Sequence, residues 1–482
     1  MKKLFFTVFS AIMFSCLVSC SSINTPPPPP PPQPSILPST TLKLPGIFGN
    51  HMVLQRGKPI RVWGWAAPST EITAEIDGQS TSVTAGKTGT WLLQLPSMQA
   101  GGPYTMKVSD GKTEQTFKDV MVGEVWICSG QSNMELPLQG TRGCPVDNSE
   151  NEIKNANYKD IRLIKIPKKP AIAPLYDIAK TPWTRCTPKT AAPFSAVAYF
   201  FGKKLYKELN VPIGLILSAW GGTPCQSWSS SKILTEFPKY KNWFDDQRKK
   251  GKKLNSWTPT SLYNGMIQPL VPLSISGFIW YQGEANRRWP KEYQSLFPSM
   301  ISDWRNRFEQ GDLPFFYCQI APFNYKKKDA GVQLRDAQRK SLNKLPNLGM
   351  VVLADKTTIN NIHPPYKKDA GERLAFWALN KVYGKDIPYS GPLFKSSTTD
   401  GETIIVSFDY GDGLNGSLKE FEIAGKDKKF YPAVGEIEGC KIRLKSPKVS
   451  KPVFVRYAWS NISTGGLFNK YRLPASSFTS EK

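Results

Sequence analysis

The sequence predicts an α/β protein with a mostly parallel, doubly wound sheet, preceded and followed along the chain by β regions. Between about residues 120 and 385, apolar runs alternate with segments whose apolar residues recur at helical spacing. Residues 41–119 and those after Tyr389 instead show short β-branched and aromatic runs separated by turn residues. Hydrophobic residues are 40% of 482, including 14 tryptophans, so the chain is long and apolar enough for a large core.

The first residues have the features of an export signal. Two lysines precede the apolar stretch 4–17, which is too short to span a membrane as a mature helix. The sequence L-V-S-C that ends at Cys20 resembles a bacterial lipobox, which implies cleavage before this cysteine and lipidation of its thiol. Residues 1–19 are therefore expected to be a lipoprotein signal peptide.

Residues 20–40 contain an unbroken proline run, Pro26–Pro32, and predict a semi-rigid linker. No later segment is apolar enough to span a membrane, so we expect an exported protein that is held only by its lipid anchor, in the periplasm or at the cell surface.

The region 41–119 is expected to be a small β-sandwich domain because turn residues separate short strands at regular intervals. Its predicted strands are Pro59–Ala66, Glu71–Ile76, Thr90–Leu95 and Tyr104–Ser109.

The region 120–387 is expected to be the α/β domain, and 388–482 a second β region. The strands expected in the α/β domain are Val120–Ile127, Ile161–Ile166, Val211–Ser218, Ile275–Tyr281, Leu313–Ile320 and Gly349–Leu353. The expected helices are Ser195–Leu209, Pro290–Phe308, Leu334–Leu345 and Asp369–Val382. The last region should contain the strands Thr403–Phe408, Lys441–Leu444 and Val453–Tyr457.

The strand Val120–Ile127 breaks abruptly into small and polar residues, in G-E-V-W-I-C-S-G-Q-S-N-M-E at 123–135. A strand that ends in Ser-Gly-X-Ser makes a tight turn that lifts one hydroxyl clear of the sheet edge, where α/β proteins place their chemistry. Ser132 is therefore the candidate nucleophile. The alternative is a turn whose serine only caps a backbone amide.

A serine nucleophile needs a base, and histidine is the usual one. The chain has two. His51 lies in the N-terminal β region and is expected to be structural, whereas His363 follows the last strand of the α/β domain. We predict that His363 is the base.

Two other Gly-rich loops follow strands of the same domain, after Ser218 and after Tyr281. The ends of parallel strands share one edge, so these loops should meet the nucleophile turn. Such convergence is what acyl transfer needs: a nucleophile and donors aimed at an oxyanion.

The segments G-Q-S-N-M, W-Y-Q-G-E-A-N and N-N-I-H-P-P resemble the sialate O-acetylesterase-like branch of the SGNH hydrolases, and the likeness spans about residues 48–478. This resemblance implies an SGNH/flavodoxin-like three-layer sandwich and a serine esterase that removes O-acetyl groups from carbohydrates. It assigns the oxyanion hole to the backbone of Ser132, to Gly222 and to Asn286, with Gly221 as an alternative to Gly222.

In one respect the chain departs from that family, which often has an acid two or three residues before the histidine. Here Asn361 and Asn360 stand in those places, so a Ser–His dyad is the working form. The group that orients the ring could be a backbone carbonyl, an asparagine oxygen or a carboxylate from elsewhere, such as Asp355 or Glu284. The expected supporting residues are Gln131, Asn133, Gln282, Glu284 and Asp355.

Composition limits the other classes. The net charge of +25 is scattered and no nucleic-acid recognition motif accompanies it, so no nucleic-acid partner is expected. Neither a cofactor nor a metal is expected, since two histidines and no C-x-x-C spacing make a zinc site improbable. Six cysteines remain after Cys20, and neither their pairing nor the oligomeric state can be read from the sequence.

The expected substrate is an acetylated sugar or glycan, with O-acetylated sialic acid as the first choice. Acetylated plant polysaccharides such as xylan or xyloglucan are the alternative substrates. The alternative to an enzyme is a carbohydrate-binding lipoprotein that has lost catalysis. Its best support is the missing acid before the histidine.

Overall fold

The computed structural model describes residues 41–241, 243 and 254–481. The predicted signal peptide, the linker and Cys20 lie outside these residues. Within them, none of the helices is both long and apolar enough to cross a lipid bilayer.

The centre of the fold is a sheet with the strand order β13–β12–β11–β7–β10–β8–β9. Each neighbouring pair on this path is parallel except β8–β9, so the sheet is mixed at one edge. The antiparallel edge strand β9 was not expected from the sequence, because three residues are too few to show a periodic pattern. The strands are β7 Glu114–Gly130, β8 Tyr158–Lys165, β9 Thr184–Cys186, β10 Ile213–Ala219, β11 Gly277–Tyr281, β12 Phe315–Cys318 and β13 Leu348–Val351.

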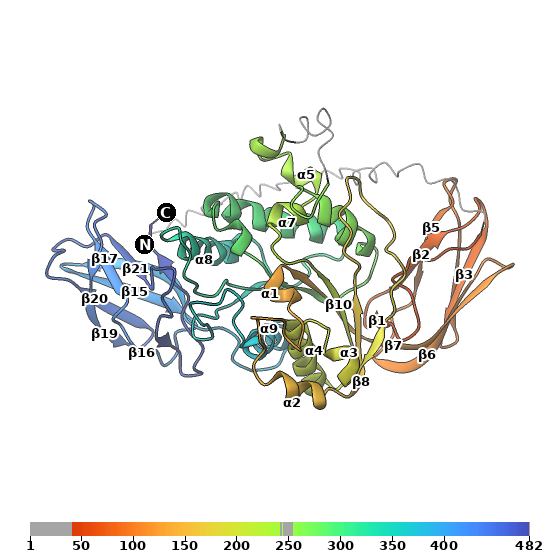
Figure 1. Cartoon of the computed structure of the whole chain (residues 1–482), viewed down its shortest axis with the longest axis horizontal. Coiled ribbons are helices and arrows are strands. Elements are labelled where there is room, and N and C mark those ends of the chain that lie inside the picture. Colours follow the sequence, from red (N-terminus) through yellow and green to blue (C-terminus); the bar gives the residue numbers. More distant parts are fainter. Residues whose placement is uncertain (1–40, 242, 244–253, 482) are drawn as a thin grey trace, which may run out of the picture. The chain divides into compact units, whose positions relative to one another are not determined.

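Helices cover both faces of this sheet (Figure 1). Alternate residues of each strand point to opposite faces, and each face packs into its own hydrophobic cluster. Apolar side chains of α7 and α8 belong to one cluster and those of α4 and α9 to the other. These helices are α4 Ala196–Leu209, α7 Pro290–Phe308, α8 Ala330–Ser341 and α9 Lys367–Lys381; the shorter ones are α1 Ser132–Glu135, α2 Ser149–Lys154, α3 Pro188–Ala191 and α5 Ser231–Leu234.

Strand β7 belongs both to the N-terminal β region and to the central sheet. Its first part pairs with β6 (Gly101–Ser109) and β1 (Val53–Gln55), and its last residues pair in parallel with β10 and β11. The boundary expected after residue 119 therefore falls inside one continuous strand of 17 residues. Two adjacent sheets share this strand, which the change in sequence pattern alone could not show.

The N-terminal β region is antiparallel apart from the parallel β1–β7 pair. Strands β2 and β5 form one sheet, while β3 pairs with β4 and β6 in the other. Apolar residues of both belong to one hydrophobic cluster. The remaining strands of this region are β2 Ile60–Trp65, β3 Glu71–Ile76, β4 Gln79–Thr84 and β5 Thr90–Leu95.

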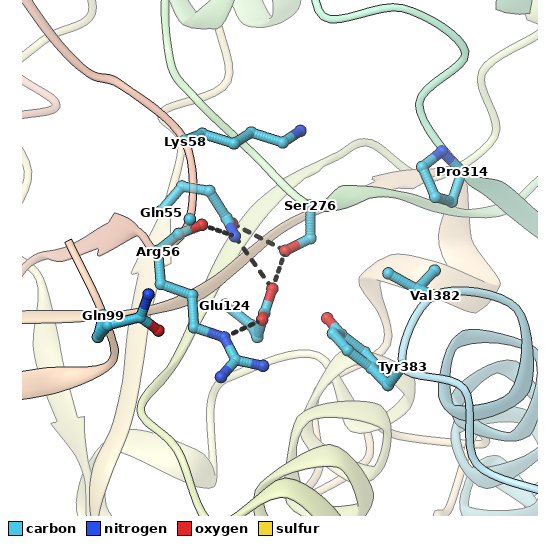
Figure 2. Close-up of a pocket in the computed structure, with 10 residues that line it drawn as sticks. Gln55, Arg56, Lys58, Gln99, Glu124, Ser276, Pro314, Val382 and Tyr383 are labelled. Carbon is cyan, nitrogen blue, oxygen red and sulfur yellow. Dashed lines mark hydrogen bonds and ion pairs between the residues drawn. The ribbon is translucent and has the colours of Figure 1, made fainter. Parts of the chain in front are cut away.

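A buried polar cluster joins this region to the amino ends of the central strands (Figure 2). The carboxylate of Glu124, on β7, is paired with Arg56 and accepts hydrogen bonds from Gln55 and Ser276. Glu124 is only 4% exposed, and removing one partner of such a buried pair typically costs about 3–5 kcal/mol. The cluster therefore fixes the end of the sheet that lies opposite Ser132.

His51 has a structural role in the N-terminal β region, as its contacts among the described residues indicate. Its Nδ1 lies 2.5 Å from Oδ2 of Asp119, and the same carboxylate binds Arg162 and Arg185. These charge-assisted hydrogen bonds hold the pKa of Asp119 well below its usual range, against the opposing effect of burial. The prediction that His51 is not the base agrees with this placement.

The C-terminal β region consists mainly of antiparallel strands in small sheets. Polar contacts join it to α8: the guanidinium of Arg335 donates to the carbonyl oxygens of Ser460 and Asn461 and to Ser477 Oγ. The strands are β14 Leu393–Asp400, β15 Thr403–Asp409, β16 Asn415–Gly416, β17 Phe421–Ala424, β18 Tyr431–Pro432, β19 Val434–Glu438, β20 Lys441–Lys445, β21 Phe454–Tyr457, β22 Leu467–Phe468 and β23 Phe478–Thr479.

Candidate active site

Ser132 lies where β7 leaves the sheet. Gly130 has φ +136°, and a Cβ at this position would lie 2.2 Å from the carbonyl oxygen of Tyr281 on β11. Only glycine allows β7 to pass its neighbour so closely and then turn. Ser132 begins the short helix α1, so the expected turn takes the form of a strand-to-helix junction.

His363 faces this serine from the loop between β13 and α9. Its Nε2 lies 2.8 Å from Ser132 Oγ, and its backbone N–H donates to Asn361 Oδ1 at 2.9 Å. Burial, and to a smaller degree the positive charge of Lys367, lowers the pKa of His363 from its ordinary value. The ring is therefore neutral and able to accept a proton near neutral pH.

Neither carboxylate that the sequence offered as a partner contacts this imidazole. Asp355 forms a two-pronged ion pair with Arg373, at 2.7 and 2.6 Å. Among the described residues, the Glu284 carboxylate accepts a hydrogen bond from Asn133 Nδ2, at 2.6 Å. The other ring nitrogen of His363, Nδ1, instead lies 3.4 Å from the sulfur of Cys144.

The side chain of Asn133 connects the nucleophile helix to the histidine loop. Its Nδ2 donates to Glu284 Oε1 and to the carbonyl oxygen of Ile362, and its Oδ1 accepts from Lys367 Nζ. Burial lowers the pKa of Lys367 to about 8 and raises that of Glu284. A buried cation and a buried carboxylate thus support the peptide that carries His363.

The third loop, after β11, forms a buried amide network. Asn286 Oδ1 accepts from the backbone N–H of Cys225 at 2.8 Å and from Gln282 Nε2 at 2.7 Å, while its Nδ2 donates to Gln226 Oε1 at 3.0 Å. Gln131 Oε1 accepts from two backbone N–H groups of the same loop. The predicted supporting residues Gln131, Asn133 and Gln282 therefore fix the loops of the site, and Glu284 does so through Asn133.

The backbone N–H groups of the Gly-Gly pair after β10 differ in their hydrogen bonding. The N–H of Gly221 donates to Glu135 Oε2 at 2.6 Å. No hydrogen bond is found for the N–H of Gly222 among the described residues, and this glycine has φ +73°. The other oxygen of Glu135 pairs with Lys168, whose ammonium lies 5.2 Å from the centre of the Trp220 ring.

Ser132, His363 and Cys144 line a pocket of about 440 Å³, together with the polar residues Glu135, Gln139 and Thr141 and the apolar residues Leu136, Pro137 and Pro193. Lys165, at the end of β8, also lines it, and the partner found for its ammonium among the described residues is the carbonyl oxygen of Pro193, at 3.5 Å. The pocket wall therefore carries the carboxylate of Glu135, which pairs with Lys168, and the ammonium of Lys165, for which no ion pair is found among the described residues.

Sequence reasoning missed four contributors to this site: Cys144, Lys367, Glu135 and Lys165. Glu135 follows the nucleophile closely and could have been noted on that ground. The others have no local signal, because lysines are common in this chain and Cys144 lies in a loop without periodicity.

Among the described residues, no group of three or more His, Cys, Asp and Glu side chains could hold a metal ion. The cysteines described there are free; four of them are buried, Cys144 is half-buried and Cys440 is exposed.

A serine hydroxyl within hydrogen-bond distance of a neutral imidazole, at the carboxyl edge of parallel strands, defines a hydrolase-type site. A profile of the family described as carbohydrate esterase, sialic acid-specific acetylesterase, matches residues 122–375. The chain belongs to this family, and it is a carbohydrate acetylesterase, a carboxylic ester hydrolase.

Similar proteins include sialate O-acetylesterases of vertebrates. The human protein is 32% identical over 71% of this chain and 72% of its own length. The orangutan (Pongo abelii) protein is 30% identical over 82% and 79%, respectively. A crystal structure of a carbohydrate acetylesterase from Xanthomonas citri aligns with a TM-score of 0.82 and 36% identity, covering 91% of this chain and 99% of that one.

Proposed function

We propose that this enzyme removes O-acetyl groups from sialic acids, with Ser132 as nucleophile and His363 as general base. The observation that carries the assignment is the 2.8 Å contact between Ser132 Oγ and His363 Nε2 in a pocket large enough for a sugar ester. The relatives named sialate O-acetylesterase support the substrate class.

The reaction proceeds through an acetyl-enzyme. Ser132 Oγ attacks the acetyl carbonyl carbon while its proton passes to His363 Nε2. The tetrahedral intermediate then collapses, the bond to the sugar oxygen breaks, and the imidazolium returns the proton to that oxygen. A water molecule then gives a proton to His363 Nε2 and attacks the carbonyl carbon of the acetyl-serine. The second tetrahedral intermediate collapses, the bond to Ser132 Oγ breaks, and the imidazolium returns the proton to this oxygen as acetate leaves.

The oxyanion is held by the backbone N–H groups of Ser132 and Gly222 and by the side-chain amide of Asn286. Gly222 is preferred over Gly221 because the N–H of Gly221 is already bonded to Glu135. Asn286 Nδ2 has two hydrogens, and its described bond to Gln226 uses one of them. Each such donor is typically worth about 3 kcal/mol of barrier.

We further propose that the α/β domain has the SGNH fold. A three-layer sandwich of the SGNH type is supported by the parallel strands β7, β10, β11, β12 and β13 and by helices on both sheet faces. The proposed regions are 41–119, 120–387 and 388–482, with β7 shared by the first two.

We also propose that the protein is exported and anchored through a lipid on Cys20. The L-V-S-C sequence and the proline-rich stretch up to residue 40 support this proposal. Labelling of the expressing bacterium with a fatty-acid probe should mark the wild-type protein but not Cys20→Ala; equal labelling of both would contradict it.

Acetate release tests the esterase assignment, measured in parallel on O-acetylated sialic acid and on acetyl-xylan. We expect release mainly from the sialic acid, and its loss in Ser132→Ala. Lys165→Ala should raise KM for the anionic sialic acid several-fold while leaving KM for a small neutral ester unchanged, because Lys165 lines the pocket and no ion pair is found for it among the described residues. Release from acetyl-xylan alone would overturn the sialic acid substrate, and normal release by Ser132→Ala would overturn the nucleophile.

A further inference from the structure

We propose that Cys144 is a positioning residue for the base, its sulfur accepting a hydrogen bond from Nδ1–H of His363 in the place that a carboxylate has in Ser–His–Asp triads. The inference rests on the roles proposed above for Ser132 and His363.

The geometry of the imidazole requires an acceptor at this place. Nε2 must be unprotonated to take the proton of Ser132, 2.8 Å away, so the neutral ring carries its hydrogen on Nδ1. The partner described for Nδ1 is Cys144 Sγ, at 3.4 Å, which is within the range of hydrogen bonds to sulfur. A sulfur acceptor thus selects the tautomer that catalysis needs.

Among the described residues, the groups that could orient the ring in the conventional way are bonded elsewhere. Asp355 is paired with Arg373, and Glu284 is bonded to Asn133. Asn361 Oδ1, which stands close to the expected acid position, accepts from the backbone N–H of His363. Asn360 is exposed.

Asn361 instead holds the cysteine loop against the histidine loop. While its Oδ1 caps the backbone of His363, its Nδ2 donates to the carbonyl oxygen of Gly143 at 3.3 Å. Cys144 and Thr141 exchange two backbone hydrogen bonds, at 2.9 and 3.0 Å, so the turn that carries the thiol is closed. The asparagine at the altered position therefore aligns the sulfur with Nδ1.

The charged groups around the imidazole of His363 are consistent with an uncharged acceptor at Nδ1. Lys367, on α9, lowers the pKa of His363, while Glu135 and Lys165 line the same pocket and Glu284 lies behind Asn133. A thiol at Nδ1 adds no negative charge to this set, so the imidazole stays neutral in the resting enzyme. A carboxylate at the same place would instead favour the imidazolium.

Kinetics of Cys144 variants test the proposal, with Cys440→Ala as the matched control because Cys440 is exposed on the C-terminal β region. Cys144→Ala should lower kcat about tenfold and change KM less than about twofold, since the lost bond strengthens as the imidazolium forms. Cys144→Ser should recover part of the rate through its hydroxyl oxygen. Cys144→Asp should move the acid limb of the pH profile of kcat/KM to higher pH.

A spectroscopic measurement remains decisive if a variant is poorly stable. The chain has two histidines, so ¹⁵N-histidine labelling gives two imidazoles, and comparison with the Cys144 variants assigns His363. We expect the Nδ1–H tautomer of His363 in the wild-type protein and in Cys144→Ser, and a mixture of tautomers in Cys144→Ala.

The outcomes separate this inference from the proposed function. If Ser132→Ala is inactive but Cys144→Ala keeps the wild-type kcat, pH profile and His363 tautomer, the role of Cys144 is overturned and the esterase mechanism stands. Turnover retained in Ser132→Ala would overturn the mechanism itself. A tenfold loss in Cys144→Ala that Cys144→Ser partly recovers, with Cys440→Ala unchanged, supports both.

Discussion

The side-chain amide of Asn133 donates a hydrogen bond to the carbonyl oxygen of Ile362, at 3.0 Å. One of these residues follows Ser132 and the other precedes His363. The bond therefore connects the two peptides that carry the proposed nucleophile and base. Lys367 Nζ donates to the Oδ1 of the same asparagine and so helps to fix the position of its side chain.

We expect Asn133→Ala to lower kcat about 10- to 100-fold with a small change in KM, because a displaced histidine loop misaligns Nε2 with Ser132 Oγ. Steady-state kinetics on an acetyl ester, together with a crystal structure of the variant, measures this effect. Asn151→Ala, at an exposed asparagine on α2, is the control and should behave as wild type. An unchanged kcat in Asn133→Ala would show that this bond is dispensable.

The pH profile should reflect the lowered pKa of His363. The base acts in its neutral form, so a pKa below the ordinary 6.5 keeps the enzyme active to correspondingly lower pH, and the acid limb of kcat/KM should fall below pH 6.5. The double variant Lys367→Met/Glu284→Gln removes the buried cation together with its countercharge. Its acid limb should move to higher pH, because the loss of the Lys367 charge raises the pKa of His363.

Glu284→Gln alone is the control for this experiment, since it keeps the positive charge and should not move the limb upward. An acid limb at the wild-type pH in the double variant would remove Lys367 as a cause of the shift.

The oxyanion role of Asn286 can be separated from its structural role. Asn286→Asp keeps an oxygen to accept from Cys225 N–H and Gln282, but it loses the Nδ2 donor. We expect a loss of about 10²- to 10³-fold in kcat. The melting temperature should fall as well, because the new carboxylate is buried and faces Gln226 Oε1. Gln226→Ala, which removes only the present partner of Nδ2, should cost far less activity, and a similar loss in both variants would point to disruption of the network instead.

Gly130 is expected to be intolerant of any side chain. Gly130→Ala should lower the free energy of unfolding by at least about 2 kcal/mol, because its φ is unfavourable for alanine and its Cβ would meet the carbonyl oxygen of Tyr281. Chemical denaturation measures this change. Gly401→Ala is the matched control, since its φ is also positive, at +58°, but a Cβ there meets nothing within 4 Å. Equal costs at the two sites would mean that the close approach of β7 and β11 can relax.

Local patterns allowed much of this protein to be predicted from its sequence. Helix α7 has the expected bounds, Pro290–Phe308, because a proline marks its first turn and its apolar residues are evenly spaced. The junction at Ser132 could be located because an apolar strand ends in small residues. His363 could be chosen because the chain has one other histidine.

The partners of these residues could be known only from the tertiary structure. Cys144 and His363 are 219 residues apart in the chain, and Asn133 and Lys367 are 234 apart, so no local periodicity brings either pair together. Long-range packing likewise decided that Asp355 binds Arg373 and that Gly221 donates to Glu135. The groups that could do the chemistry were recognisable in the sequence, since local pattern encodes the strands and turns that carry them. Only the fold decided what surrounds each group, because burial and charge depend on contacts between distant segments.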